Sequence, residues 1–308
     1  MKGTNWMVKG SSVVLALAFL AGCASTPTGG GEDYSGLYSG KSELTFSTLL
    51  PVESAAEGIA RGDAARARGD LDQAIFEYIR TLELEPDNPE SFYKIGAINL
   101  QKEELTKAHT AFQSALEKDA DHAGSLEGMG LVLMQMRQPD RARLVLEKAV
   151  SLDPKLGKAH NALGILADLR GDFERAGQHY NDALMLSPLS ARIQNNLGYS
   201  HYLAGQWEQA ERAYLAALNV DPWHKRAWQN LGQLYTRQER FDEALEVLTE
   251  VMSEAEALNT MGYISMSGEK FEDAEKFFTQ AAQASPSYYV TANENLEQVR
   301  RQIAKREP

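Results

Sequence analysis

The chain has 308 residues, of which 43% are hydrophobic and 24% are charged, a balance typical of folded globular proteins and not of disordered or collagen-like chains. It carries 31 Lys and Arg against 43 Asp and Glu, and the resulting net charge of -12 disfavours general nucleic-acid binding, which needs positive charge. Because there is a single Cys, an intrachain disulfide and a Cys-rich metal site are both excluded.

Residues 1–22 have the pattern of a secretory signal. Two lysines precede an apolar run from residue 13 to residue 20, which is too short to cross a bilayer as a helix. The run ends in the sequence L-A-G-C at residues 20–23, which resembles a bacterial lipobox. The resemblance implies cleavage before Cys23 and acylation of Cys23. An ordinary signal peptide with a chance Cys is the alternative.

The residue after the acylated Cys determines where such lipoproteins are sorted. Here it is Ala24, and a residue other than Asp at this position implies the outer membrane. We therefore expect a protein of the cell envelope that is held by its lipid at the periplasmic face of the outer membrane. Residues 23–54 are predicted to be the lipidated Cys and a flexible tether, since the segment from Ala24 to Gly31 is too poor in apolar residues to pack. A short segment that docks back on the folded part is the alternative.

Residues 55–288 contain a repeat of 34 residues. Glycine recurs at this spacing in one column and alanine in a second, and both columns share a last interval of 30 residues. The columns are Gly62, Gly96, Gly130, Gly164, Gly198, Gly232 and Gly262, and Ala74, Ala108, Ala142, Ala176, Ala210, Ala244 and Ala274. Two columns in one register make coincidence negligible.

The period and its columns resemble the tetratricopeptide repeat (TPR). The resemblance implies an all-α fold, a right-handed superhelix of about seven helix-turn-helix units with a C-terminal capping helix. The units are expected at 55–88, 89–122, 123–156, 157–190, 191–224, 225–254 and 255–288. Because the sixth lacks four residues near its end, we expect a shortened second helix or turn there. Residues 289–308 are predicted to form the capping helix and a basic tail.

Each column has a physical reason. Gly at position 8 and Ala at position 20 are small because the two helices of a unit approach closely there. Proline at position 32 ends the second helix in five units. Large apolar residues at position 17 are predicted to be core residues: Phe173, Trp207, Phe241 and Phe271.

The sequence offers no recognisable catalytic motif. None of the six His lies in an H-E-x-x-H motif or another short metal-ligand spacing, and no nucleophile elbow or phosphate-binding loop is present. His160 and His201 occupy positions that usually hold packing residues, so we expect them to be buried core histidines. We therefore predict a protein that is not an enzyme and that has no catalytic residues, no metal site and no cofactor.

The TPR resemblance also implies an inner groove lined by positions 2, 5, 6, 9, 12 and 13 of each first helix. In units four to seven these positions hold basic, amide and tyrosine side chains: Lys158, Asn161, Arg192, Asn195, Asn196, Tyr199, Tyr202, Arg226, Gln229, Asn230, Gln233, Arg237, Asn259 and Tyr263. Amides donate and accept hydrogen bonds, so a column of them can pair with a peptide backbone. Basic groups in an acidic chain favour an acidic segment.

We therefore predict that units four to seven bind an extended or C-terminal acidic segment of a protein partner. A solvated polar groove without a ligand is the alternative. The equivalent positions of units one to three are more apolar and include Tyr93, Leu131 and Met134. This difference indicates that the first three units contact another surface or the tether.

A lipobox followed by repeats with N-N-L at 195–197 and Q-N-L-G at 229–232 resembles the TadD lipoproteins of tight-adherence (Tad, or Flp) pilus assembly. The resemblance implies an accessory role at the outer membrane, where the pilus secretin or another pilus or secretion component would be the partner. This chain has Gly after the Leu where the family often has Ala. Two alternatives stay open: a pilotin of type IV pili, and an adaptor for cell-wall hydrolases and their protease, as in NlpI-like lipoproteins.

Overall fold

The structure, a computed structural model, describes residues 52–285 and 289–306. The predicted signal peptide, Cys23 and the tether up to residue 51 lie outside the described residues, as do residues 286–288 and 307–308. Within the described ranges every element of regular secondary structure is a helix, which confirms the all-α prediction. No helix in these ranges combines the length and the apolar character that crossing a membrane requires.

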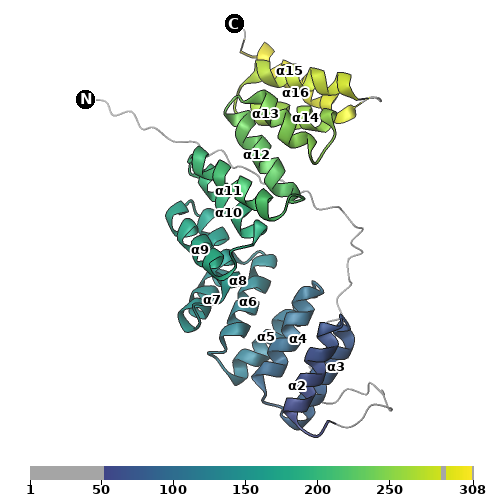
Figure 1. The fold of residues 1–308 in the computed structure, drawn as a ribbon, viewed down its shortest axis with the longest axis vertical. Helices are drawn as coiled ribbons and strands as arrows, with labels where there is room; N and C mark the ends of the chain where they lie inside the picture. Colours follow the sequence, from purple (N-terminus) through teal and green to yellow (C-terminus); the bar gives the residue numbers. More distant parts are fainter. Residues whose placement is uncertain (1–51, 286–288, 307–308) are drawn as a thin grey trace, which may run out of the picture.

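Two helices form each repeat unit. The first helices are α2 (Ala55–Ala67), α4 (Pro89–Gln101), α6 (Ala123–Gln135), α8 (Gly157–Asp168), α10 (Ala191–Leu203), α12 (Lys225–Arg237) and α14 (Glu254–Ser267). The second helices are α3 (Leu71–Leu84), α5 (Leu105–Lys118), α7 (Pro139–Leu152), α9 (Phe173–Leu186), α11 (Trp207–Val220), α13 (Phe241–Thr249) and α15 (Phe271–Ala284). The pairs stack into an extended array, with α2 and α3 at one end (Figure 1).

Each helix packs against the next one along the chain, and from α4 to α14 the first helices of neighbouring units also contact one another. The last helix, α16 (Val290–Ala304), packs on α15 and α14 at the other end of the array (Figure 1). It buries Ala292, Leu296 and Val299. This helix therefore covers the last unit, as a capping helix does in repeat proteins.

The alanines of position 20 are fully buried in all seven units. The glycines of position 8 lie beneath a large side chain of the second helix, and a Cβ added to Gly164 would stand 2.6 Å from Tyr180 Cε1. The same contact recurs along the array through position 24, which holds Tyr78, Phe112, Leu146, Tyr180, Tyr214, Leu248 and Phe278. The sequence predicted a close approach at the glycine, and the structure identifies the side chain that requires it.

Polar side chains cap the N-termini of most of the first helices. Ser190 Oγ accepts from the backbone N–H of Ile193, and His122 and His224 accept through Nδ1 from the third residue after them. Such caps satisfy backbone donors that a helix start leaves unpaired. Two of the six His are thus N-caps. The turn inside a unit places one residue in the left-handed region, as at Gly171 with φ +73°, where Gly has no steric cost.

Two core predictions were wrong. Trp207 is 41% exposed because it begins α11 and only its edge packs, against Tyr202 at a ring-centroid distance of 5.4 Å. His201 is half-buried and lies 2.6 Å from Gln206 Oε1, so it is a surface residue with a polar partner. His160, by contrast, is buried as predicted. The shortened helix expected in unit six is α13, which has 9 residues against 14 in the other second helices.

Candidate functional site

The first helices of units four to six, α8, α10 and α12, contact one another in sequence and carry most of the predicted groove residues. Arg192, Asn195, Asn196 and Arg226 line one hollow of about 340 Å³. Its remaining lining comes from the turn between units five and six: Asp221, Trp223, His224 and Lys225. The structure therefore brings four of the predicted residues together around one concave surface, which we call the basic hollow.

The basic hollow carries more positive than negative charge, with three basic side chains and one acid, Asp221, in its lining. Arg192, Lys225 and Arg226 are exposed, and none of them makes an ion pair within the described residues. The same is true of Lys158 and of Arg237, which donates to Ser267 Oγ at 3.2 Å. Asp221, which also lines the hollow, accepts from the backbone N–H of Trp223 at 3.0 Å. In a chain of net charge -12, this is a local excess of positive charge.

The amide side chains of the predicted groove bind one another between units. Asn196 Nδ2 donates to Asn161 Oδ1 at 3.0 Å, and Asn230 Nδ2 donates to Asn195 Oδ1 at 2.9 Å. In each pair, position 6 of one unit donates to position 5 of the preceding unit. Asn161 and Asn195 are buried, so these hydrogen bonds supply a donor to side-chain oxygens that water does not reach. We term the two contacts the amide pairs.

From the sequence these amides were predicted to bind a ligand, and their pairing was missed. The pairing uses one oxygen of each position-5 residue and one NH₂ group of each position-6 residue, which leaves part of each amide for another partner. Gln233 is similarly engaged, since its Nε2 donates to Tyr202 Oη at 3.1 Å. Binding of a peptide by the amides therefore stays a prediction, with less hydrogen-bonding capacity than the sequence alone indicates.

An aromatic group adjoins the amide pairs on α10. Tyr199 and Tyr202 stack with their centroids 6.0 Å apart and an interplanar angle of 15°, and Trp207 meets Tyr202 edge-on. Burial raises the pKa of Tyr199, with a smaller contribution from Tyr202. Trp223, at the rim of the basic hollow, is 87% exposed. Exposed aromatic area beside positive charge is typical of protein-binding surfaces.

Not all the predicted residues belong to this surface. Asn259 Oδ1 accepts from Asn295 Nδ2 of α16 at 3.0 Å, so it joins the last unit to the capping helix. Tyr263 is 58% exposed and lines a separate hollow with Phe271 and Arg306. Trp223 and Lys225 were not predicted from the sequence, because they lie in the turn and at the helix start and not at the groove positions.

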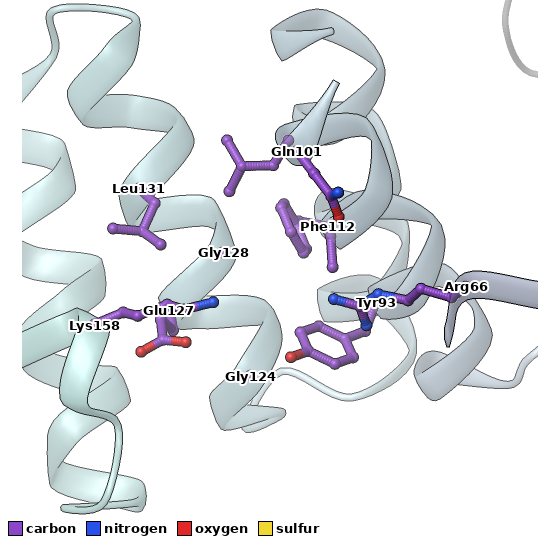
Figure 2. A pocket seen from close by; sticks show the side chains of 11 residues that line it. Arg66, Tyr93, Gln101, Phe112, Gly124, Glu127, Gly128, Leu131 and Lys158 are labelled. Atoms are coloured by element: carbon purple, nitrogen blue, oxygen red, sulfur yellow. The ribbon is translucent and has the colours of Figure 1, made fainter. Parts of the chain in front are cut away.

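A second hollow of about 360 Å³ lies between α4 and α6, where Ala97, Leu100, Phe112 and Leu131 line it together with polar and charged side chains (Figure 2). Arg66 and Lys158 lie at opposite sides of it, and Tyr93 faces α6 from α4 (Figure 2). Gly124 and Gly128 line it at positions 2 and 6 of unit three, where the absence of a side chain lets the rings of Tyr93 and Phe112 pack against α6. We call this second hollow the apolar hollow.

The apolar hollow contains one half-buried acid, Glu127, whose Oε1 accepts from the backbone N–H of Ala159 at 2.9 Å. Burial raises the pKa of Glu127, although this hydrogen bond and the charge of Lys158 act in the opposite direction. Burial likewise raises the pKa of Tyr93. Lys158 was predicted for the groove of units four to seven, and the structure places it in the lining of the apolar hollow and not of the basic hollow.

Four sequence models of the tetratricopeptide repeat match the chain, over residues 62–103, 128–191, 189–253 and 255–288. A comparison with curated proteins finds no match. Among solved structures, a tetratricopeptide repeat protein from Parabacteroides merdae ATCC 43184 is similar over 81% of this chain and 100% of its own, with 19% identity and a TM-score of 0.54. The structure of Pseudomonas aeruginosa pilF is similar over 68% of this chain and 97% of its own, with 18% identity and a TM-score of 0.52.

Proposed function

Because the chain belongs to the tetratricopeptide-repeat proteins, which are scaffolds for protein partners, we propose that it is a lipid-anchored outer-membrane scaffold that assists the assembly or localisation of a Tad/Flp-type pilus or secretion apparatus. The anchor is supported by the L-A-G-C sequence that ends at Cys23, and the pilus assignment by the resemblance of the later repeats to the TadD lipoproteins. The similarity to pilF concerns the fold alone.

The observation that carries the binding proposal is the excess of positive charge in the basic hollow, whose three basic side chains make no ion pair within the described residues. Arg192, Lys225 and Arg226 converge on one surface beside the exposed ring of Trp223. An acidic segment with an apolar side chain matches this surface, since guanidinium groups bind carboxylates through paired hydrogen bonds and Trp supplies apolar area. The partner class is thus a protein segment that carries carboxylates, presented in the periplasm by a secretin or another component of the apparatus.

The binding test compares two charge-matched double variants. Arg192→Ala with Arg226→Ala removes two exposed groups of the basic hollow, and Arg212→Ala with Lys276→Ala removes two exposed cations elsewhere. Loss of two charge-assisted contacts should cost about 3 kcal/mol, or roughly 100-fold in affinity, while the control pair should retain capture. The readout is pull-down from detergent-solubilised envelope with mass spectrometry. Equal capture by both pairs contradicts binding at the basic hollow.

The nature of the captured protein tests the wider proposal. A pilus secretin recovered with the wild-type chain supports it, and a cell-wall hydrolase as the main partner favours the adaptor function instead. The control pair uses Arg212 and not its neighbour Glu211, because the carboxylate of Glu211 accepts hydrogen bonds from Tyr235 and Arg240 at 2.7 to 3.2 Å. Replacing Glu211 would alter the packing of α11 against α12 as well as surface charge.

The anchor has its own test. Cys23→Ser removes the only residue that can be acylated at the lipobox, so the chain should stay unprocessed or become soluble in the periplasm. Fractionation of the envelope measures this, with the wild-type chain as reference. A Cys23→Ser variant that remains in the outer membrane when the basic hollow is also disrupted contradicts the lipid anchor.

A further inference from the structure

Unit four brings together three metal-binding side chains from two helices. His160 lies on α8, and His179 and Asp182 lie three residues apart on α9, so that they project from one face of that helix. One ligand atom from each residue lies within 4.8 Å of the others. His160 Nδ1 is 3.3 Å from His179 Nδ1 and 3.5 Å from Asp182 Oδ2. No short sequence motif predicts this cluster.

The hydrogen bonds of His160 decide which of its nitrogens is available. Its Nε2 lies 3.1 Å from the carbonyl oxygen of Pro154, which can only accept, so the ring proton of neutral His160 belongs on Nε2. The lone pair is then on Nδ1, the atom that faces His179 and Asp182. A ring N–H bound to a backbone carbonyl is the arrangement that orients metal-binding histidines.

The distances match those between the ligands of a tetrahedral zinc ion. With bonds of about 2.0 to 2.2 Å from zinc to nitrogen and oxygen, neighbouring ligand atoms stand about 3.3 to 3.5 Å apart. The distances of 3.3 Å and 3.5 Å measured from His160 Nδ1 fall in this range. Two imidazoles and one carboxylate are also a ligand set that zinc commonly takes.

Burial and charge at the cluster favour a cation. His160 is 8% exposed, whereas the side chain of Asp182 is 42% exposed, so an ion can enter from solvent. The charged groups near His179 are Asp182, Glu147 of α7 and Arg175 of α9, so acids outnumber bases around the cluster.

We propose that His160 Nδ1, His179 Nδ1 and an Asp182 carboxylate oxygen form a Zn²⁺ site in unit four, with water in the fourth position. The ion joins the first and second helices of the unit and so stabilises the middle of the array. This site is independent of the basic hollow, which lies between units five and six. It departs from the sequence-based expectation of no metal site, because its ligands are distant in sequence.

The test uses the full chain in detergent, stripped of metal with a chelator and titrated with ZnCl₂ by calorimetry. The wild-type chain and His201→Gln, a histidine variant outside the cluster, should each bind one Zn²⁺. His179→Gln and Asp182→Asn should bind it at least about 100-fold more weakly, because each loses a direct ligand. Bound Zn²⁺ should raise the Tm of the wild-type chain by about 5 °C at 100 times Kd.

Two further measurements keep the result specific. Co²⁺ in place of Zn²⁺ should give the visible absorption of a tetrahedral site in the wild-type chain and lose it in Asp182→Asn. Mg²⁺ should not compete, since it avoids imidazole ligands. The site is refuted by no Zn²⁺ binding in the wild-type chain, or by equal binding in all four chains. Circular dichroism checks that the variants are folded. If His179→Gln does not fold, Asp182→Asn carries the test, because Asp182 is partly exposed.

Discussion

Units two and three differ from units five and six in the contacts that join consecutive first helices. In units five and six, position 6 is Asn, and the amide pairs link each first helix to the preceding one. In unit two the same position is Lys94, whose Nζ binds Asp63 Oδ1 at 2.9 Å. In unit three it is Gly128, against which the ring of Phe112 packs so closely that an added Cβ would overlap it. One position therefore decides whether neighbouring units share an amide bond, an ion pair or an aromatic contact.

The cations follow the same division. Lys94, Lys102 and Lys118, all in unit two, lie within ion-pair distance of acids of their own unit or of unit one. Arg192 and Arg226 have no such acid among the described residues. The division holds at these positions and not for every cation, since Arg240 of unit six pairs with Glu211. Because the backbone arrangement is the same in both regions, side-chain choice alone sets which cations are paired.

The largest effect is expected from the glycine column. Gly164→Leu would force its side chain into Tyr180, whose Oη is held by Asp168 Oδ2 at 2.7 Å, and should lower the free energy of unfolding by about 2 to 4 kcal/mol. Gly130→Leu meets the flexible Leu146 and should cost less. Denaturant unfolding followed by circular dichroism measures both.

Gly177→Ala is the control for the glycine series. It lies in α9 of the same unit with no atom within 4 Å of an added Cβ, and it should stabilise the chain by about 0.5 to 1 kcal/mol. A loss at position 177 as large as that at position 164 would show that the ring of Tyr180 does not set the effect.

The amide pairs should make a smaller contribution. Asn196→Ala removes the donor to Asn161 and leaves a buried carbonyl oxygen unpaired, which should cost about 1 to 2 kcal/mol. A double-mutant cycle with Asn161→Ala should give a coupling energy of about 1 kcal/mol, since the two residues share one hydrogen bond. The matched comparison in the first half is Lys94→Ala with Asp63→Ala, an ion pair whose Asp63 is exposed to solvent and which is expected to couple by less. A coupling energy near zero for Asn161 and Asn196 would contradict the inference that the amide pairs stabilise the contact between units.

The smallest effect concerns acid. Hydrogen bonds from Lys102 and Lys107 hold the pKa values of Asp72 and Glu104 below their ordinary 3.8 and 4.5, so their stabilisation is complete above those values and is lost as the pH falls through the lower folded-state values. Burial raises the pKa of Asp168 in the folded state, so the ionised carboxylate destabilises the fold. Protonation removes this destabilisation as the pH falls through the raised pKa.

Acid should therefore weaken α2 to α5 more than the middle units. Hydrogen exchange near pH 7 and near pH 3.5, each corrected for the intrinsic exchange rate, would compare protection in the two regions. Added salt should reduce the difference, because the pairs of Asp72 and Glu104 are solvent-exposed. A larger loss of protection in the middle units would contradict this assignment of charges.

Much of the fold was predictable because repetition makes packing visible in sequence. The Gly and Ala columns gave the register, and position 20 is fully buried throughout. Position 24 carries the same 34-residue signal but alternates between Tyr, Phe and Leu, so a search for identical residues did not find it. Trp207 misled because a large apolar residue at a helix start can remain at the surface.

The site was less predictable because its contacts join residues about 35 apart in sequence. Asn161 and Asn196 each look like a free amide when read alone, and only the stacking of α8 on α10 shows that they bind each other. His122 and His224 share position 34, which identifies them as caps once the helix starts are known. Trp223 owes its place to a turn, which a pattern of helix positions does not describe.

The four residues missing from unit six also bear on how such arrays change length during evolution. Four residues make slightly more than one turn of an α-helix, so removing them rotates the downstream chain by only about 40°, whereas removing two would rotate it by about 160°. α13 is one turn shorter than its equivalents and still buries Ala244 and Leu248, and its Phe241 meets Phe277 of α15 with centroids 4.9 Å apart. Deletions of about one turn are therefore the ones that a second helix can accept while its buried face stays buried.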